Sequence, residues 1–316
     1  MSCAEVTLFV GDALGSYGFP GGHPFSIDRQ GAFWAKAQQQ GLDRRVTVSA
    51  PRLASREELL RFHDEAHVQW VEACSKSGTG FIDYGDTPAF PGVFDSAAAV
   101  VGTALEALER IASGATARTF QPIGGMHHSR RDRAAGFCVF NDIGAVIDTL
   151  RSKHGVGRIA YVDIDVHHGD GVYYPYEHDP DLIIVDIHED GRFLYPGTGH
   201  AHEEGRGAAE GTKLNIPMAP GAKDGDFDAA WERALDHLRR HRPQFIIFQA
   251  GADGIAGDPL ADLHYTPEVH ARATRSLVSL AGELAEGKLM VFGGGGYDLG
   301  NIAAAWTEVL RALAPD

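Results

Sequence analysis

Residues 161–171 read YVDIDVHHGDG, an apolar segment that carries three aspartates and two histidines toward its end. Isolated charges in a buried strand are costly to desolvate unless they are paired or bind a metal ion. Asp165 and His167 are two residues apart, so both side chains point to the same face of a strand and can reach one ion. The segment therefore predicts a buried strand that leads into a metal site.

Short apolar, β-branched runs alternate with helix-period segments along the chain. The predicted strands are Val6–Val10, Phe120–Ile123, Ile159–Val166, Leu182–His188, Phe245–Gln249 and Leu289–Phe292, and Leu214–Ile216 is strand-like. The predicted helices are Arg56–Lys76, Phe94–Ser113, Asp142–His154, Phe227–His241, Pro267–Ala285 and Ile302–Ala312. This alternation predicts an α/β fold with a mostly parallel sheet covered by helices on both faces. The sequence has no internal repeat and no linker, so we expect a single domain over residues 1–316.

Charge and cysteine content narrow the class of protein. The net charge is −15 at pH 7 and no block is rich in Lys or Arg, which argues against nucleic-acid binding. Cys3, Cys74 and Cys138 are too sparse for a disulfide framework or a metal-binding spacing, which indicates a reducing compartment. We find neither a signal-peptide pattern nor an apolar run of the ~20 residues that span a bilayer. We expect a cytoplasmic protein without a nucleic-acid or membrane partner, and leave a homo-oligomer open.

Polar clusters follow the carboxyl ends of four predicted strands. These clusters are GGMHHS after Ile123, HHGDG after Val166, AGADG after Gln249 and GGGGY after Phe292. In open parallel sheets, ligands bind at the carboxyl edge of the strands. The four clusters therefore predict one site.

The third ligand of the predicted metal site is Asp253, in the AGADG cluster. A catalytic zinc takes three protein ligands and keeps a fourth position open. The alternative interpretation is that such carboxylates cap helices or make structural hydrogen bonds, which a lone aspartate would favour. Asp163, deeper on the same face, is a candidate to anchor a histidine or to hold a structural cation. Asp170 is a candidate to orient a second histidine.

The adjacent histidines His127 and His128 are candidates for proton transfer. Neighbouring side chains on a strand point in opposite directions, so both enter one site only where the backbone is irregular, which the preceding glycines permit. Two imidazoles with separate carboxylate partners could divide the work, one charged or orienting and the other shuttling a proton. An isolated pair of histidines would be an accident more often than a functional pair.

The glycine run before Tyr297 lacks the Lys-Ser/Thr of a phosphate-binding loop. We expect these glycines to clear space beside a ligand and Tyr297 to stabilise a developing oxyanion, with a core tyrosine as the alternative. Phe137 and Tyr195 lie in predicted loops, where an aromatic side chain more often indicates binding than packing. His63 and His67 are expected to be structural or to face solvent.

Six motifs occur in a characteristic order, namely GGMHHS, AGFCVFNDI, YVDIDVHHGDG, PGTG, AGADGIAGDPL and GGGGYD. With them the chain resembles the zinc-dependent histone deacetylase superfamily, especially its bacterial branch of acetoin-utilisation proteins and histone-deacetylase-like amidohydrolases. The resemblance extends from Gly18 to Asn301. It implies the arginase/deacetylase fold, in which helices flank a central eight-stranded parallel sheet on both faces.

The resemblance also implies roles for individual residues. The implied zinc ligands are Asp165, His167 and Asp253; the implied acid/base pair is His127, backed by Asp163, and His128, backed by Asp170; and Tyr297 would bind the scissile carbonyl. The implied substrate-binding residues are Gly136, Phe137, Tyr195, Leu260 and Gly295. A structural potassium ion is implied near Asp163, Asp165, His167, Asp186 and Ile187, partly through main-chain oxygens.

Two positions depart from the family pattern. Asp186 stands where many relatives have serine, so we expect it either to bind the implied potassium ion more tightly or to rearrange that site. The rim aspartate that holds the peptide backbone in several relatives has no clear counterpart, and Asp83 is the candidate.

The implied reaction is hydrolysis of the Nε-amide of acyl-lysine in proteins or peptides. The main alternative substrate is an acylpolyamine, although polyamine-selective relatives can carry an acidic residue where Leu260 stands. An arginase-like site with two manganese ions is disfavoured, because Met126 stands where those enzymes have aspartate. A binding module without catalysis finds no support, because every catalytic position is filled.

Overall fold

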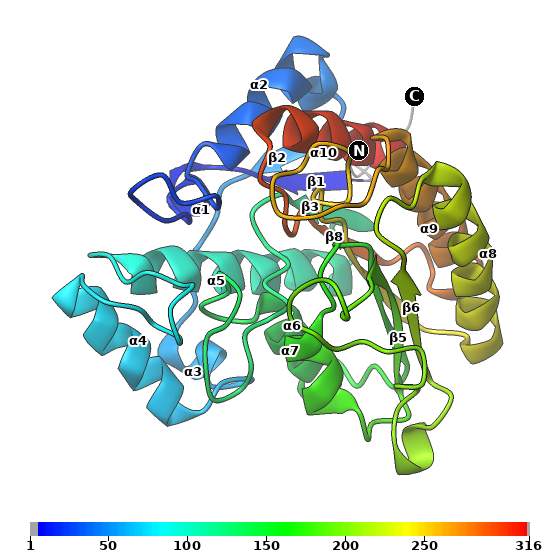
Figure 1. The fold of residues 1–316 in the computed structure, drawn as a ribbon, viewed down its shortest axis with the longest axis horizontal. Coiled ribbons are helices and arrows are strands. Elements are labelled where there is room, and N and C mark those ends of the chain that lie inside the picture. Colours follow the sequence, from blue (N-terminus) through cyan, green and yellow to red (C-terminus); the bar gives the residue numbers. More distant parts are fainter. Residues whose placement is uncertain (1–5, 315–316) are drawn as a thin grey trace.

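The computed structural model describes residues 6–314, in which eight parallel strands form one sheet (Figure 1). The strands are β1 (Val6–Phe9), β2 (Thr47–Ser49), β3 (Arg118–Gln121), β4 (Ile159–Asp163), β5 (Leu182–Glu189), β6 (Lys213–Met218), β7 (Phe245–Gln249) and β8 (Leu289–Phe292). Their order in the sheet is β2-β1-β3-β8-β7-β4-β5-β6. The predicted eight-stranded parallel sheet is confirmed. Cys3 lies outside the described residues.

Helices cover both faces of the sheet. They are α1 (Asp12–Gly15), α2 (Arg29–Gln39), α3 (Arg56–Leu59), α4 (Glu65–Ser77), α5 (Val93–Ala112), α6 (Asp142–Ser152), α7 (Asp170–Tyr173), α8 (Asp224–His241), α9 (Glu268–Leu284) and α10 (Leu299–Leu313), with short 3₁₀ turns at Leu42–Arg44, Tyr174–Tyr176 and Gly207–Ala209. On one face α2, α10, α9 and α8 pack in a row, and α4, α5 and α6 pack together on the other (Figure 1). None of these helices has the length and apolar character that crossing a membrane requires.

The central strands β4, β5, β7 and β8 are buried over their whole length. Parallel strands that are covered on both faces read as continuous apolar runs, which is why the sequence predicts them well. Polar side chains interrupt the runs only near the carboxyl ends. Asp163 at the end of β4 pairs in register with Asp186 of β5, and with Gln249 at the end of β7.

The helix predicted over Arg56–Lys76 is wrong, because α3 ends at Leu59 and α4 begins at Glu65. The intervening turn makes contacts with distant segments. His63 Nε2 accepts a hydrogen bond from Asn141 N at 2.8 Å, and Asp64 N donates to Arg131 O at 2.8 Å. These tertiary contacts outweigh the local helical periodicity. His63 and His67 are both buried, so their role is structural.

Candidate active site

The four polar clusters lie at the carboxyl ends of β3, β8, β7 and β4, which are consecutive neighbours in the sheet. Because parallel strands end at the same edge, this order brings the four clusters together. The residues that the sequence singles out therefore meet above the centre of the sheet rather than along its rim.

Asp165, His167 and Asp253 form a buried group whose candidate metal-binding atoms all lie within 4.8 Å of one another. His167 Nδ1 lies 3.1 Å from Asp165 Oδ1 and 3.2 Å from Asp253 Oδ2. Burial and the neighbouring charge of Asp165 raise the pKa of Asp253 to about 7. Two buried carboxylates this close repel each other unless a cation compensates them. Two carboxylate oxygens and one imidazole nitrogen are a donor set that zinc accepts, so this group could hold a metal ion.

Neighbouring groups fix the orientation of the two carboxylates. Asp165 Oδ2 accepts hydrogen bonds from Gln249 Nε2 and Gly295 N, both at 2.7 Å. Asp253 Oδ1 accepts a hydrogen bond from Val166 N at 3.0 Å. Such contacts hold metal-binding side chains in place. Gln249 was not predicted, because the last residue of an apolar strand gives no signal of this role.

His127 and His128 both enter the site because the backbone before them is irregular. Gly125 has a positive φ of 82°, which glycine adopts readily, and Asp142 accepts hydrogen bonds from the N–H groups of Gly125 and Met126, each at 2.8 Å. The centroids of the two imidazole rings are 4.1 Å apart.

Each histidine has its own carboxylate partner. His127 Nδ1 lies 2.8 Å from Asp163 Oδ2, and His128 Nδ1 lies 2.7 Å from Asp170 Oδ1. Burial alone would lower the pKa of His127, but the charges of Asp165 and Asp163 outweigh it and raise the pKa to about 10. Burial and the charge of His127 lower the pKa of His128 to about 4. In the metal-free protein these opposite shifts favour a charged His127 and a neutral His128.

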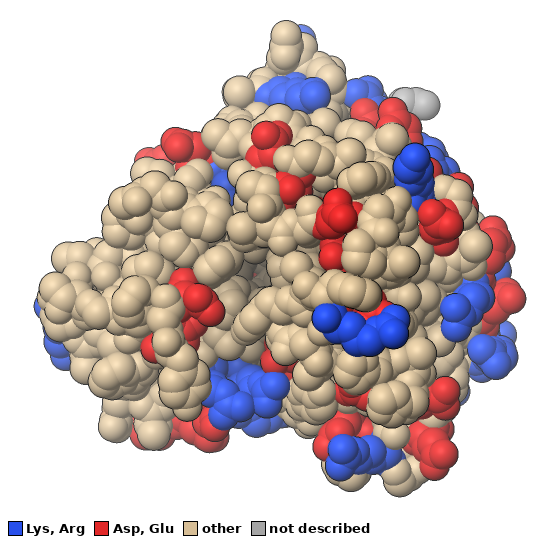
Figure 2. All heavy atoms as spheres, in the orientation of Figure 1, with Lys and Arg blue, Asp and Glu red and all other residues tan. Residues whose placement is uncertain are grey.

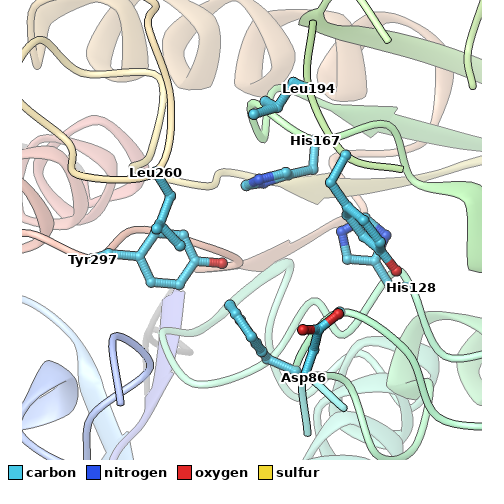
Figure 3. A pocket seen from close by; sticks show the side chains of 9 residues that line it. Asp86, His128, His167, Leu194, Leu260 and Tyr297 are labelled. Atoms are coloured by element: carbon cyan, nitrogen blue, oxygen red, sulfur yellow. The ribbon is translucent and has the colours of Figure 1, made fainter. Parts of the chain in front are cut away.

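A main cavity of about 240 Å³ opens above this group, and Figure 2 shows a hollow in a mainly uncharged part of the surface. It is lined by Asp86, His128, Gly136, Phe137, His167, Leu194, Tyr195, Leu260 and Tyr297. The Tyr297 hydroxyl points toward the space in front of His167 and His128 (Figure 3). Four of the five predicted substrate-binding residues line this cavity. Gly295, the fifth, lines an adjoining inner cavity of about 10 Å³.

The glycine run at 293–296 packs closely against the protein's own groups, and Gly294 and Gly295 also line the inner cavity, so its role in clearing space for a ligand stays a prediction. A Cβ atom on Gly294 would lie 2.2 Å from Gln249 Nε2, and one on Gly295 would lie 2.2 Å from Asp253 Oδ2. The run is held by the buried Arg29, which donates to Gly296 O at 3.0 Å and to Gly294 O at 2.5 Å. Arg29 was not predicted, because it lies in the helix α2 that the sequence did not reveal.

The carboxylate at the mouth of the main cavity belongs to Asp86, and the assignment of Asp83 to this position was wrong. Asp83 is turned into its own loop, where Oδ1 accepts hydrogen bonds from Gly85 N, Asp86 N and Thr87 N at 2.9–3.0 Å. Asp86 lines the cavity instead.

The residues of the implied potassium site lie together, but Asp186 already has protein partners. Its Oδ1 lies 2.6 Å from His188 Nδ1, and its Oδ2 accepts a hydrogen bond from Gly169 N at 2.9 Å. Asp163 pairs with Asp186 in the register of the sheet, and the buried Ile187 follows Asp186 in the chain. The site stays a prediction, and His188 is a neighbour that the sequence did not single out.

The strand order and the position of the site place the chain in the class of α/β proteins with the arginase/deacetylase fold. The profile of the histone deacetylase domain matches residues 23–313. The acetoin utilization protein AcuC of Bacillus subtilis (strain 168) is 37% identical over 278 residues, which cover 84% of this chain and 69% of that protein. Histone deacetylase 8 of Xenopus laevis is 34% identical over 274 residues, which cover 84% of this chain and 82% of that protein.

A solved structure agrees with the sequence comparisons. The crystal structure of the HDA15 HD domain matches 99% of this chain and 89% of its own, with a TM-score of 0.91 and 28% identity. The chain belongs to the histone deacetylase family and is a hydrolase of that family.

Proposed function

We propose that this protein is a zinc-dependent amidohydrolase that removes acetyl or other acyl groups from the Nε-amine of lysine in proteins or peptides. We further propose that it acts as a single cytoplasmic domain with a structural potassium ion. The observation that carries the proposal is the position of the buried Asp165, His167 and Asp253 group beneath a cavity that His128 and Tyr297 also line.

Zinc held by Asp165, His167 and Asp253 would supply a Lewis acid for the amide carbonyl and lower the pKa of a bound water toward ~7. Side chains of the protein would carry out the proton transfers. Neutral His128 donates from Nδ1 to Asp170, so its Nε2 is available to accept a proton from the attacking water. The resulting imidazolium then delivers that proton to the leaving amine.

Tyr297 and His127 would stabilise charge during this reaction. The Tyr297 hydroxyl faces the cavity and would donate a hydrogen bond to the oxyanion that forms from the carbonyl. His127, whose Nδ1 lies 2.8 Å from Asp163 Oδ2, would contribute a positive charge beside the same position. Its charge also keeps His128 neutral, and so fit to act as the base.

The residues that line the main cavity support a lysine side chain as its occupant. The walls at Phe137 and Tyr195 are aromatic, and both Leu194 and Leu260 are apolar. Such walls fit the methylene stem of acyl-lysine and exclude water from the reacting amide.

Two features would also suit the alternative substrate, an acylpolyamine. The Asp86 carboxylate lies at the mouth of the cavity, where it could bind either peptide N–H groups or the distal ammonium group of a polyamine. The net charge of −15 would likewise attract a cationic amine.

The deciding experiment compares kcat/KM on acetyl-lysine peptides with kcat/KM on acetylputrescine, before and after treatment with a chelator. We expect the peptides to be preferred, activity to disappear with the chelator and zinc to restore it. Metal analysis should give one zinc per chain, and this zinc should be lost in Asp253→Ala. A preference for acetylputrescine would support the alternative, and full activity without metal would refute the zinc proposal.

A further inference from the structure

Phe137, which lines the main cavity, has a backbone conformation that residues with a side chain rarely adopt. Its φ is 68°. For a bulky residue a positive φ is disfavoured, and it persists only where the surrounding structure holds it. Of the non-glycine residues that the structure describes, Arg242 and Glu286 share this feature, but both lie at the ends of helices, where a left-handed residue is common. Phe137 lies in the loop between β3 and α6, so its conformation needs another cause.

Two hydroxyl groups hold both polar groups of the Phe137 backbone. The Tyr17 hydroxyl donates a hydrogen bond to Phe137 O at 2.7 Å and accepts one from Val139 N at 3.0 Å. The Thr87 hydroxyl oxygen accepts a hydrogen bond from Phe137 N at 3.2 Å, and the same hydroxyl donates to Asp83 Oδ2 at 2.6 Å. We call Tyr17 and Thr87 the Phe137 clamp. Because the clamp holds both the amide and the carbonyl, it accounts for the positive φ.

The clamp residues are themselves fixed, and they lie outside the cavities. Tyr17 and Thr87 are both buried. The Tyr17 ring packs edge-on against Phe25, with the ring centroids 5.5 Å apart, and the Thr87 N–H donates to Asp83 Oδ1 at 2.9 Å. Neither clamp residue is among the described residues that line the main or the inner cavity. Their hydroxyl groups therefore act on a substrate through the backbone that they hold.

The backbone of Phe137 determines where its ring lies. The ring packs edge-to-face with Tyr297, with the centroids 5.8 Å apart and an interplanar angle of 82°, and with His23, at 4.5 Å and 84°. Rotation about the N–Cα bond toward an ordinary negative φ would redirect the Cα–Cβ bond and break these contacts. The ring would then leave the wall of the main cavity.

We propose that Tyr17 and Thr87 are positioning residues, which keep the Phe137 ring in the cavity wall and thereby set the affinity for the methylene stem of acyl-lysine. This inference rests on the proposed function and adds two residues outside the cavity to it. Without one of the hydroxyl groups, the ring would occupy the wall for only part of the time, and the apparent affinity would fall by that fraction. A saturating substrate would still select the state with the ring in the wall, so kcat would be retained.

The test measures kcat and KM on blocked acetyl-lysine, which has no flanking residues. Tyr17→Phe and Thr87→Val each remove one hydroxyl and keep the shape of the side chain. We expect each variant to raise KM about three- to tenfold, the scale of one hydrogen bond, with kcat within about twofold of the wild-type value. Thr87→Ser keeps the hydroxyl and should retain the wild-type KM. A merely structural role would lower the fraction of folded enzyme, and so the apparent kcat, without changing KM.

A double variant shows whether the clamp acts through the Phe137 ring. Phe137→Ala removes the ring and should raise KM by itself. Adding Tyr17→Phe to Phe137→Ala should then raise KM no further, because the ring that the hydroxyl positions is already gone. Two increases in KM that multiply would overturn the inference, and so would a wild-type KM in both Tyr17→Phe and Thr87→Val.

Tyr176→Phe and Thr103→Val are the matched controls. Both side chains are buried and bind main-chain groups: the Tyr176 hydroxyl donates to Gly144 O at 3.2 Å, and the Thr103 hydroxyl oxygen accepts a hydrogen bond from Arg52 N at 3.3 Å. Neither residue lines the main cavity or belongs to the clamp. These variants should therefore retain the wild-type KM, whatever they do to stability.

The two sides of the clamp are tested separately, so the inference does not depend on the folding of Tyr17→Phe. Circular dichroism shows which variants are folded. Absence of acyl-lysine turnover in the wild-type protein would overturn the proposed function itself. An active wild-type protein whose KM does not respond to loss of either hydroxyl would overturn the inference alone.

Discussion

The Asp258 carboxylate connects the rim of the main cavity to the candidate oxyanion donor. Its Oδ2 accepts a hydrogen bond from Tyr297 N at 2.8 Å, and its Oδ1 accepts one from Leu260 N at 3.0 Å. Tyr297 follows Gly296, whose φ is 121° and whose carbonyl oxygen accepts a hydrogen bond from Arg29 Nε at 3.0 Å. Asp258, which does not line the cavity, therefore helps to position the Tyr297 side chain, together with Arg29.

Asp258→Ala should lower kcat about tenfold or more, with little change in KM, because it releases the backbone that aims Tyr297. Tyr297→Phe removes the donor itself and should lower kcat by roughly 10²-fold or more, the usual effect of losing an oxyanion donor. If Asp258 acts through Tyr297, the double variant should be no slower than Tyr297→Phe. Steady-state kinetics of the wild-type protein, the two single variants and the double variant measure this. If the double variant loses kcat by the product of the two single losses, Asp258 does not act through Tyr297. The control is Asp262→Ala, which removes an exposed carboxylate from the same loop. This carboxylate contacts His264.

Gly295→Ala should weaken metal binding without unfolding the protein. The added Cβ would lie 2.2 Å from Asp253 Oδ2 and 2.8 Å from Asp165 Oδ2, so both carboxylates would have to move. We expect a loss in zinc affinity of about 10–100-fold, the scale seen when the supports of metal ligands are disturbed. Competition with a chromophoric chelator measures this directly. Gly282→Ala on α9, where a Cβ has open space, is the control, and wild-type affinity in Gly295→Ala would show that the site tolerates the methyl group.

Asp253→Asn should stabilise the metal-free protein at alkaline pH and abolish its stabilisation by zinc. Burial and the charge of Asp165 raise the pKa of Asp253 to about 7. A carboxyl group whose pKa is raised on folding destabilises the folded protein progressively as pH rises from ~4 to about 7, and fully above that range. Removing the charge should therefore raise the free energy of unfolding at pH 8 by on the order of 1–3 kcal/mol.

Thermal unfolding of both proteins, with and without zinc, tests this prediction. Zinc at 100-fold its Kd should stabilise the wild-type protein by about 2.7 kcal/mol and leave the variant unchanged. Asp236→Asn, on the exposed face of α8, should respond to zinc as the wild-type protein does. A metal-free Asp253→Asn protein that is less stable at pH 8 would show that its hydrogen bonds to Val166 and His167 outweigh the charge repulsion.

The centre of the sheet could be predicted because its strands are buried on both faces, which leaves an uninterrupted apolar pattern. The edge strand β2 was missed because it has three residues, two of them exposed, and so lacks that pattern. The position of the site could also be predicted, since chemistry-bearing residues follow the strand ends and topology alone brings those ends together.

The residues that hold the site in place could not be predicted from the sequence, because they bind main-chain groups that are far away along the chain. Arg29 binds carbonyl oxygens more than 260 residues away, and Asp258 binds an N–H group 39 residues away. The choice between Asp83 and Asp86 likewise depends on how one turn closes. Both are acidic, and only the closed turn shows that the first caps the loop while the second lines the cavity.

A buried histidine outside the site should make the protein sensitive to mild acid. His270 on α9 is buried, and its Nε2 lies 2.7 Å from Gly251 O, in the segment that leads to Asp253. Burial lowers the pKa of His270 to about 4. The unfolded chain therefore takes up a proton near pH 6.5 that the folded protein refuses until about pH 4, so stability falls as pH decreases through this window.

Between pH 7 and pH 5, His270 should account for a loss of roughly 2 kcal/mol in the free energy of unfolding. His270→Gln keeps a donor for Gly251 O but does not titrate, so its stability should fall less over the same interval by about that amount. Urea denaturation at both pH values, in the presence of a chelator to exclude metal effects, measures the difference. His264→Gln removes an exposed histidine that contacts Asp262, and it should retain the wild-type pH response. If His270→Gln and the wild-type protein lose equal stability, the acid sensitivity must come from the other buried histidines, such as His63 and His237, whose pKa values burial also lowers.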